Sequence, residues 1–264
     1  RKRYFAARQR IRHWRLFLAV LGVSKNHAIV GDLKQGLNMD DLRVAFIGQS
    51  VGSHAFSAEF YSAASDYCQR SGILAASIVL ADEPHRFSFM AIRGMDESAA
   101  IAATKRIADE KFKFLQKIAA RYPLYTIHRW NEFAAFPAFK QLLNVVEAEY
   151  RSGSALRDAI NQRFLDHVRE VTPDAIVGRG ALDLGARYIV AELALMLLMY
   201  GPLGYQVQIS PFRVPAFLQV ALTCTRILAL RELRDLRNTE IERAHVTLSA
   251  AEFLSDVEPV RIGA

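Results

Sequence analysis

The segment Gly48-Gln49-Ser50-Val51-Gly52 holds the residues of this sequence whose types and spacing most clearly suggest a role in a reaction. It follows residues 43–47, a short run rich in strand-forming residues that Gly48 is expected to end. Open α/β sheets bind ligands at the carboxyl ends of their strands, which is where Ser50 would lie. Backbone N–H groups of the next turn can stabilise an oxyanion, and Gly48 permits close approach of a substrate. We therefore expect Ser50 to be a nucleophile that carries an acyl group.

Two other interpretations of this serine stay open. The pattern G-x-S-x-G is also the signature of the nucleophile elbow of α/β hydrolases, and a serine esterase would use a later histidine such as His245 as its base. Several strands precede the elbow in that fold, whereas only 49 residues precede Ser50 here. A small serine in a tight turn, without any chemistry, fits the same pattern.

Tyr188 and Glu192 are spaced i and i+4 in a segment made mostly of Ala, Leu and Met. On a helix this spacing places the hydroxyl and the carboxylate on one face. A carboxylate on so apolar a helix is costly to bury unless it is paired, so the position favours a general base. The structural alternative is a surface glutamate, or one paired with Arg187.

A predicted helix at residues 98–121 has a basic stripe opposite its apolar arc, although Asp109 and Glu110 dilute the positive charge. Such spacing suits phosphate contacts that position a nucleic acid without reading its sequence, and an ordinary solvated face is the alternative. The residues expected to contact the nucleic acid are Lys105, Arg106, Lys113, Lys117 and Arg121, with Arg93 nearby and Lys111 toward the apolar side. The apolar arc comprises Ile101, Ile107, Ala108, Phe112, Leu115, Ile118 and Ala119.

Composition narrows the possible partners. Lys and Arg outnumber Asp and Glu by 34 to 27, and the net charge of +7 favours anionic partners such as RNA.

The two cysteines have no metal-ligand spacing, which predicts no metal site and fits a reduced cytoplasm. The longest apolar run, residues 189–200, contains Glu192 and is too short to span a bilayer. Residues 1–30 are expected to form a basic helical segment rather than a targeting signal.

Strand and helix patterns alternate along the chain, without repeats or low-complexity tracts. Such alternation predicts one α/β domain over residues 1–264, with a Rossmann-like, doubly wound, mainly parallel sheet and helices on both faces. The expected strands are residues 43–47, 73–80, 124–127 and 206–209, and the expected helices are residues 56–70, 98–121, 139–150, 154–170 and 183–198.

The segment from Phe46 to Ser50, the basic helix and the Tyr188/Glu192 pair resemble, in order and spacing, the tRNA-dependent cyclodipeptide synthases over about residues 43–219. That family resembles the catalytic domain of class I aminoacyl-tRNA synthetases without its ATP signature. This sequence likewise has no G-x-x-x-x-G-K-[ST] loop and no H-x-G-H segment.

The resemblance implies transfer from two aminoacyl-tRNAs, with no cofactor and no metal. Ser50 would take the first aminoacyl group, a second aminoacyl-tRNA would supply the attacking amine, and a dipeptidyl-enzyme would cyclise to a diketopiperazine, a natural product. Tyr188 would help to hold the amino group, and Glu192 would hold it and shuttle protons. A non-catalytic tRNA-binding module with the same fold is the alternative outside enzymes.

The resemblance also implies a set of substrate-binding residues, and this sequence departs from the family's pattern in two places. Ser53 stands where one branch has Asn, and Ser210-Pro211 stands where Tyr followed by His or Pro is usual. The chain therefore falls outside the branch with the Asn-Tyr-His trio, and Tyr205 is a speculative substitute for the missing Tyr. The implied substrate-binding residues are Phe46, Gly48, Ser53, Ile78, Leu80, Asp82, Glu83, Ser210 and Pro211, with Asp82 or Glu83 reaching the second substrate.

Overall fold

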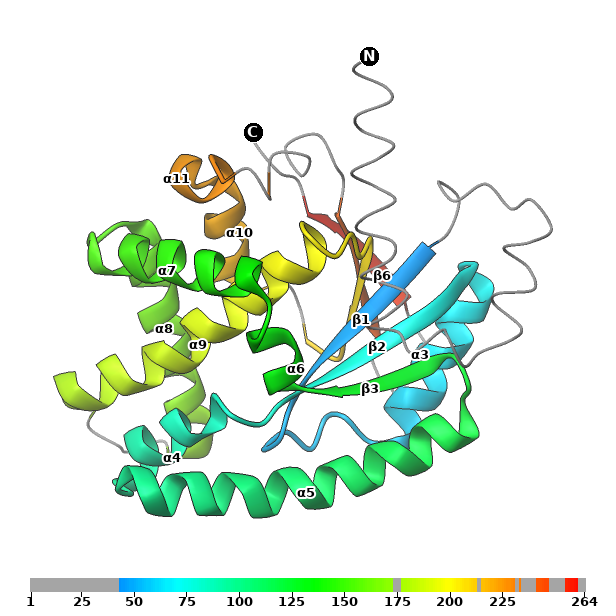
Figure 1. Ribbon diagram of the computed structural model, residues 1–264, viewed down its shortest axis with the longest axis horizontal. Coiled ribbons are helices and arrows are strands. Elements are labelled where there is room, and N and C mark those ends of the chain that lie inside the picture. The colour runs from blue at the N-terminus through cyan, green and yellow to red at the C-terminus, as the bar shows by residue number, and fades with distance from the viewer. Residues whose placement is uncertain are drawn as a thin grey trace.

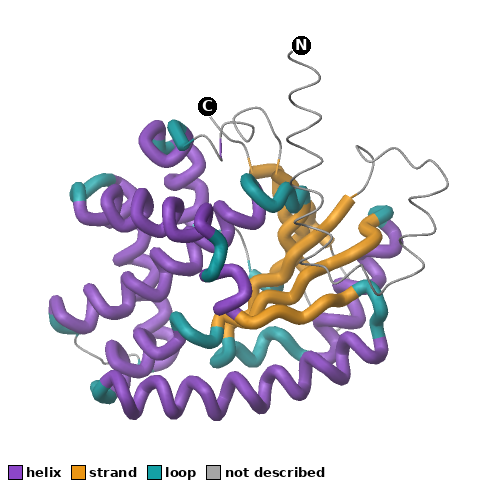
Figure 2. The backbone as a smooth tube through the Cα atoms, in the orientation of Figure 1, coloured by secondary structure: helices purple, strands orange, loops and turns teal. Residues whose placement is uncertain are grey.

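The computed structural model of the protein describes residues 43–172, 177–212, 215–230, 233, 241–246 and 255–260. The predicted basic segment at residues 1–30 lies outside these ranges, and the single-domain assignment of residues 1–264 stays a prediction. The chain is arranged as a sheet with helices on both of its faces (Figures 1 and 2).

Six strands form one sheet within the described residues, in the order β3-β2-β1-β4-β5-β6. Neighbouring strands from β3 across to β5 pair in parallel, and β6 pairs antiparallel with β5. The strand order reverses at β1, the central position at which doubly wound sheets bind ligands. The strands are β1 (Arg43–Ser50), β2 (Ile73–Ala81), β3 (Tyr125–Arg129), β4 (Val207–Ser210), β5 (Ile241–Val246) and β6 (Ser255–Val260).

Alternate residues of the strands feed two apolar cores, because successive side chains point to opposite faces. Phe46 and Val79 face the larger core, formed with α7, α8, α9 and α10, whereas Ile47 and Ile78 face the core under α3 and α5. The helices are α3 (Ala58–Arg70), α4 (His85–Arg93), α5 (Glu97–Arg121), α6 (Trp130–Ala134), α7 (Pro137–Arg151), α8 (Ala155–Val171), α9 (Arg179–Tyr200), α10 (Ala216–Thr223) and α11 (Thr225–Leu228).

Side-chain caps start the two helices beside residues 51–57, the segment after the candidate nucleophile Ser50, here named the nucleophile turn. Ser57 accepts a hydrogen bond from the backbone N–H of Phe60 at 3.3 Å and so begins α3. Asp96 accepts one from Ala99 at 2.9 Å and begins α5. Between them, α4 ends at Gly94, whose positive φ of 62° is the conformation that glycine adopts most readily.

The predicted fold class is confirmed, and all nine predicted elements are present with bounds that differ by a few residues. Gly48 was wrongly expected to end the first strand, since β1 continues to Ser50 in register with β2. The short elements α4, α6, α10 and α11, and the strands β5 and β6, were not predicted. Although α9 is apolar, no helix of the described residues is both long and apolar enough to cross a membrane.

Candidate active site

Ser50 is the last residue of β1, at the carboxyl edge of the sheet beside the strand-order reversal. Strand alternation places its side chain on the same face as Phe46, which is the face covered by α9. A Cβ atom on Gly48 would meet no atom within 4 Å, so the space beside this glycine is open. The serine thus stands at the place where a doubly wound sheet receives a ligand.

Tyr188 and Glu192 come to Ser50 from α9. A side-chain hydrogen bond joins Tyr188 to Ser50, and the Glu192 carboxylate is close enough to interact electrostatically with the phenol. Burial raises the pKa of Tyr188 well above its ordinary value, and Glu192 adds to this rise, while the bond to Ser50 opposes it. The phenol therefore remains protonated at neutral pH. The structure brings together all three residues expected to be catalytic.

The backbone around Ser50 differs from a nucleophile elbow, in which the serine occupies a sharp and strained turn directly before a helix. No described residue other than glycine has a positive φ, so Ser50 shows no such strain. Seven residues separate Ser50 from the start of α3 at Ala58. Both features argue against the α/β-hydrolase alternative.

The two acidic residues after β2 have different environments. Asp82 accepts hydrogen bonds from Arg129 at 3.1 Å and from the backbone N–H of Trp130 at 3.2 Å. Arg129 also forms an ion pair with Asp109 at 2.6 Å, so Asp82 belongs to a structural link between β2, β3 and α5. Glu83 instead lines a cavity, and burial followed by the charge of Asp82 raises its pKa. Of the two, Glu83 is the one that faces a cavity.

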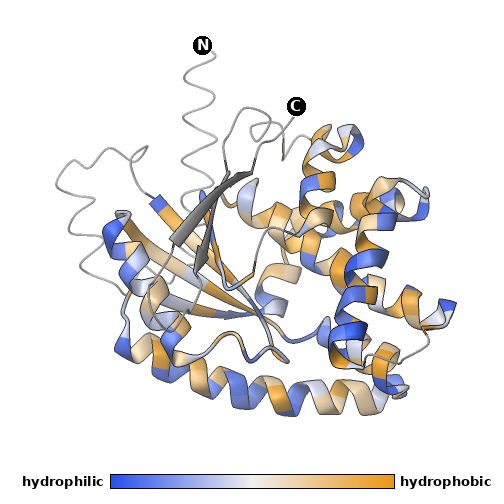
Figure 3. Cartoon of the chain, turned by 180° about the vertical axis from the view of Figure 1, so that it is seen from behind, coloured by the Kyte–Doolittle hydropathy of each residue, from blue (hydrophilic) through white to orange (hydrophobic). Residues whose placement is uncertain are grey.

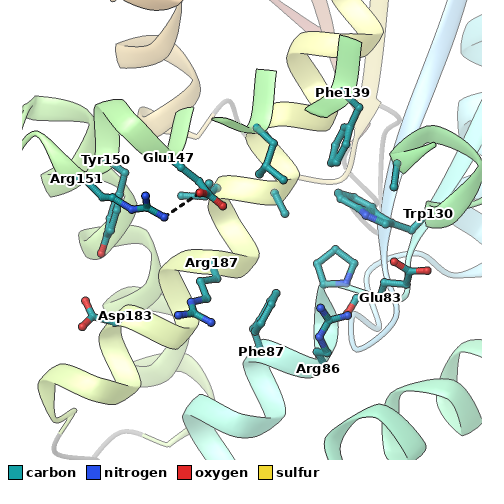
Figure 4. A pocket seen from close by; sticks show the side chains of 15 residues that line it. Glu83, Arg86, Phe87, Trp130, Phe139, Glu147, Tyr150, Arg151, Asp183 and Arg187 are labelled. Carbon is teal, nitrogen blue, oxygen red and sulfur yellow. Dashed lines mark hydrogen bonds and ion pairs between the residues drawn. The ribbon is translucent and has the colours of Figure 1, made fainter. Parts of the chain in front are cut away.

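The cavity beside Glu83 has a volume of about 580 Å³ and lies between α4, α6, α7 and α9 (Figure 4). Its walls combine the aromatic rings of Phe87, Trp130 and Phe139 with charged groups, among them Arg187 from α9. Sequence reasoning missed this cavity, because its residues come from four helices, two of which were not predicted. Apolar walls with a few charged groups are typical of small-molecule sites.

The predicted substrate pocket needs one correction. Phe46 lies edge-to-face against Tyr200, with ring centroids 5.1 Å apart, on the α9 side of the sheet. Ile78 and Leu80 are fully buried in the core on the opposite side, under α3 and α5. Strand alternation therefore keeps them away from Phe46 and Ser50. Val79 and Ala81, which pair with Gly48 and Ser50, are the β2 residues at this edge that share the α9 face.

Ser53, Ser210 and Pro211, where the sequence departs from the family's pattern, lie after the carboxyl ends of β1 and β4 or at the end of β4. Ser210 ends β4, next to β1, and its Oγ accepts a hydrogen bond from the backbone N–H of Phe212 at 3.1 Å, directly after Pro211. Ser53 lies in the turn after Ser50, where its Oγ accepts from Ala55 at 3.3 Å.

Tyr205 does not lie at this edge of the sheet. Its hydroxyl shares a 2.7 Å hydrogen bond with Ser77, which pairs with Phe46, four residues before Ser50 on β1. Since a strand rises about 3.3 Å per residue, Tyr205 lies roughly 13 Å from the nucleophile along the sheet and is a poor substitute for the missing Tyr.

The basic stripe of α5 is exposed to solvent. Figure 3 shows hydrophilic and hydrophobic residues alternating along this long helix. Asp109 pairs with Arg129 and so dilutes the stripe less than its charge implies. Lys111 is half-buried, and its Nζ donates to the carbonyl of Ser53 at 3.4 Å, directly behind the nucleophile turn. One residue of the predicted apolar arc, Ile101, is 48% exposed near the start of the helix. The exposed residues are Lys105, Arg106, Lys113, Lys117 and Arg121 on α5, and Arg93 at the end of α4.

His85 is a further residue of the site, and sequence reasoning missed it. Its imidazole packs edge-to-face against Tyr188, with ring centroids 6.1 Å apart. Its position directly after Pro84, at the end of a buried strand beside β1, was the available signal. Within the described residues, no group of three or more His, Cys, Asp or Glu side chains is arranged to hold a metal ion.

No family model and no curated protein sequence matches this chain. Solved structures are similar to it in three dimensions. A cyclodipeptide synthase from Candidatus Glomeribacter gigasporarum, bound to Phe-tRNAPhe, aligns with a TM-score of 0.60 and 16% identity over 85% of this chain and 95% of that one. A CDPS from Fluoribacter dumoffii aligns with a TM-score of 0.62 and 17% identity over 75% of this chain and 86% of that one.

A third similar structure relates this fold to a broader class of enzymes. It is a Mycobacterium tuberculosis protein described as showing that cyclodipeptide synthetases are related to type I tRNA synthetases. It aligns with a TM-score of 0.54 and 15% identity over 72% of this chain and 78% of that one. The chain thus has a fold of the class I tRNA synthetase type. More narrowly, its fold is similar to that of cyclodipeptide synthases.

Proposed function

We propose that this chain is an aminoacyltransferase that makes a cyclic dipeptide from two aminoacyl-tRNAs, through an aminoacyl ester on Ser50. The observation that carries the proposal is the hydrogen bond between Ser50 and Tyr188 at the carboxyl edge of the sheet, with Glu192 beside the phenol. The fold shared with cyclodipeptide synthases, one of them bound to Phe-tRNAPhe, supports it.

In the first step, Oγ of Ser50 attacks the carbonyl carbon of a tRNA-bound aminoacyl ester. The bond from that carbon to the ribose oxygen breaks, and the proton of the serine passes to the departing oxygen. Because Tyr188 remains protonated, its hydroxyl can donate to the serine oxygen and orient a lone pair toward the carbonyl. The exposed cations of α5 hold the tRNA by its phosphates.

In the second step, the ester bond to Ser50 must stay intact if the dipeptide is to remain on the enzyme. The attacking amine therefore belongs to the aminoacyl group on Ser50, and it attacks the carbonyl carbon of the second aminoacyl-tRNA ester. The bond from that carbon to the ribose oxygen breaks, and the released tRNA oxygen takes up the proton that the nitrogen loses as the peptide bond forms. This balance corrects the expectation that the incoming substrate supplies the amine. Glu192 accepts the proton that the ammonium must lose before it attacks. The new terminal amine then attacks the Ser50 ester, which closes the ring and returns a proton to the serine.

The cavity beside Glu83 is proposed to receive the side chain of the second aminoacyl group. Its aromatic walls, including Trp130 and Phe139, suit an apolar side chain, and Glu83 at its edge offers a partner for a charged amine. The reaction as written needs no cofactor and no metal, and its substrates are found in the cytoplasm.

The test is production of cyclic dipeptides by a bacterial host that expresses the chain, measured by mass spectrometry of the culture medium. The wild type is expected to release at least one diketopiperazine, Ser50→Ala none, and the control Ser62→Ala as much as the wild type. Equal output from Ser50→Ala would overturn the covalent route. Hydrolysis of simple esters without tRNA would favour the esterase, and unaltered aminoacyl-tRNA after incubation with purified protein would favour a binding module.

A further inference from the structure

His85 is buried between the nucleophile turn and the helix that carries Tyr188. It is the first residue of α4, its side chain is 9% exposed, and its backbone N–H donates to the Asp82 carbonyl at 3.2 Å. One edge of its imidazole faces Gly52, two residues after Ser50: a Cβ atom on that glycine would lie 3.0 Å from Cε1 and 3.1 Å from Nε2. The ring also packs edge-to-face with Phe89, with centroids 4.9 Å apart.

The ring nitrogens indicate the charge state and the tautomer of His85. Nδ1 is buried and has no hydrogen-bond partner. A proton on Nδ1 would leave an N–H donor unsatisfied in the interior, which costs more than leaving a lone pair there. The neutral tautomer with its proton on Nε2 is therefore favoured, and its N–H lies on the Gly52 side. Burial, and then the nearby charges of His167 and Arg93, lower the pKa of His85 to about 4, in keeping with a neutral ring.

We propose that His85 is a positioning residue for acyl transfer. Its neutral imidazole packs between the turn after Ser50 and the ring of Tyr188, and so fixes the hydrogen bond between Ser50 and Tyr188. The proposal rests on the proposed function of Ser50. The contact with Gly52 gives the glycine its role, because a side chain at that position would require the imidazole or the turn to shift by a few tenths of an ångström. A displacement of about 1 Å between reacting groups can cost on the order of 100-fold in rate.

The substitutions at His85 are chosen by where each one places a nitrogen relative to the imidazole ring. Gln places an amide nitrogen near the position of Nε2, whereas Asn reaches only to the position of Nδ1, so His85→Gln keeps a donor on the Gly52 side and His85→Asn does not. His85→Phe keeps a ring without any nitrogen. The matched control is His128→Asn on β3. Like His85, His128 is buried, at 3% exposure, and one of its ring nitrogens, Nε2, has no hydrogen-bond partner.

The experiment measures single-turnover loading of Ser50 from aminoacyl-tRNA by rapid quench, together with unfolding in urea. His85→Asn and His85→Phe are expected to load about 10- to 100-fold more slowly with little change in tRNA affinity, and His85→Gln to recover much of the rate. His128→Asn is expected to lose stability but to load at the wild-type rate. Wild-type loading by folded His85→Asn, or equal slowing by His128→Asn, would overturn the positioning role. Failure of the wild type to load Ser50 would overturn the proposed function itself.

A double variant tests whether Gly52 and His85 act through one contact. Gly52→Ala should slow loading, because its methyl group would lie 3.0 Å from the imidazole and would force a small shift at this contact. The combined Gly52→Ala/His85→Asn variant should be no slower than the slower single variant. Multiplicative losses would mean that the two residues act independently, and would contradict the proposal.

Discussion

Tyr188 stands between the two other groups expected to do chemistry. Its hydroxyl is hydrogen-bonded to Ser50 and lies within the field of Glu192. In the proposed reaction these neighbours have separate tasks: the phenol orients Ser50, and the carboxylate accepts a proton. The steps of the proposed reaction should therefore respond differently to loss of the carboxylate.

Glu192→Gln keeps the size of the side chain and some hydrogen bonding but removes the base. The first transfer should survive, because the neighbouring hydroxyl of the tRNA ribose can assist the departing oxygen. Dipeptide formation should fall by about 10²- to 10⁴-fold, as is typical for loss of a general base. Rapid quench with mass analysis separates the two steps, and Glu170→Gln, a solvent-exposed change on α8, is the control. Normal dipeptide output from Glu192→Gln would show that this carboxylate is structural.

His85 should make stability depend on pH. Its pKa is about 4 in the folded protein and near 6.5 when unfolded, so the unfolded chain binds more protons between these values. The free energy of unfolding should fall by about 3 kcal/mol as the pH is lowered from 7 to 4. Urea titrations of the wild type and His85→Asn across this range measure the effect. Parallel pH profiles for the two proteins would mean that His85 does not titrate in this way.

At the scale of elements, α5 connects the nucleophile turn to a long basic surface. One side of the helix packs on the sheet, and the cations of the other side are exposed. Lys111 connects α5 to the turn after Ser50, because its Nζ donates to the Ser53 carbonyl. A tRNA bound along α5 would therefore be directed toward the carboxyl edge of the sheet, where Ser50 lies.

Reversing Lys113 and Lys117 to Glu should weaken aminoacyl-tRNA binding at least tenfold and lower the magnitude of its salt slope by about 1 to 2, since each lysine releases roughly one counterion on binding a phosphate. Binding measured at several salt concentrations tests this. The control reverses Lys140 and Arg169, which are exposed on α7 and α8. An unchanged affinity and salt slope would make α5 an ordinary solvated face.

The limits of sequence reasoning are clearest in the short elements. The nine residues of α4 fit between a strand and a long helix with too few turns for an apolar pattern to stand out, so His85 was not recognised. Glycine tends to end strands, yet pairing with β2 continues through Gly48, which lies opposite Val79, and carries β1 on to Ser50. Tertiary contacts decided both cases.

At the scale of the whole molecule, the sheet and its two layers of helices follow from the alternating apolar patterns. The meeting of Ser50 with Tyr188 and Glu192 was expected from the family resemblance and not from those patterns. The choice between Asp82 and Glu83 could not be made from the sequence, because it depends on Arg129, which is 47 residues away from Asp82 in sequence. The cavity was also beyond reach, since its lining residues come from separate helices that only packing brings together.

Removal of β4 should affect the whole molecule. A chain ending at Tyr200 would leave β1 as an exposed edge strand and would lack the side chains of Val207 and Ile209 from one core. Limited proteolysis should cut this chain rapidly, whereas the full chain resists under the same conditions. A truncated chain as resistant as the full one would show that β4 is dispensable for folding.

The pairing of β1 with β4 also has a consequence for how the protein is made. The backbone N–H of Val44 bonds to the side chain of Gln206, and 162 residues separate them. Because ribosomes add about 5 to 20 residues per second, the strand that ends in Ser50 emerges roughly 10 to 30 seconds before the strand that completes its pairing. During that interval the unpaired N–H and C=O groups along the edge of β1 are open to other nascent chains. High contact order of this kind slows folding, so the yield of active protein should depend on translation rate and on chaperones that bind unfinished sheets.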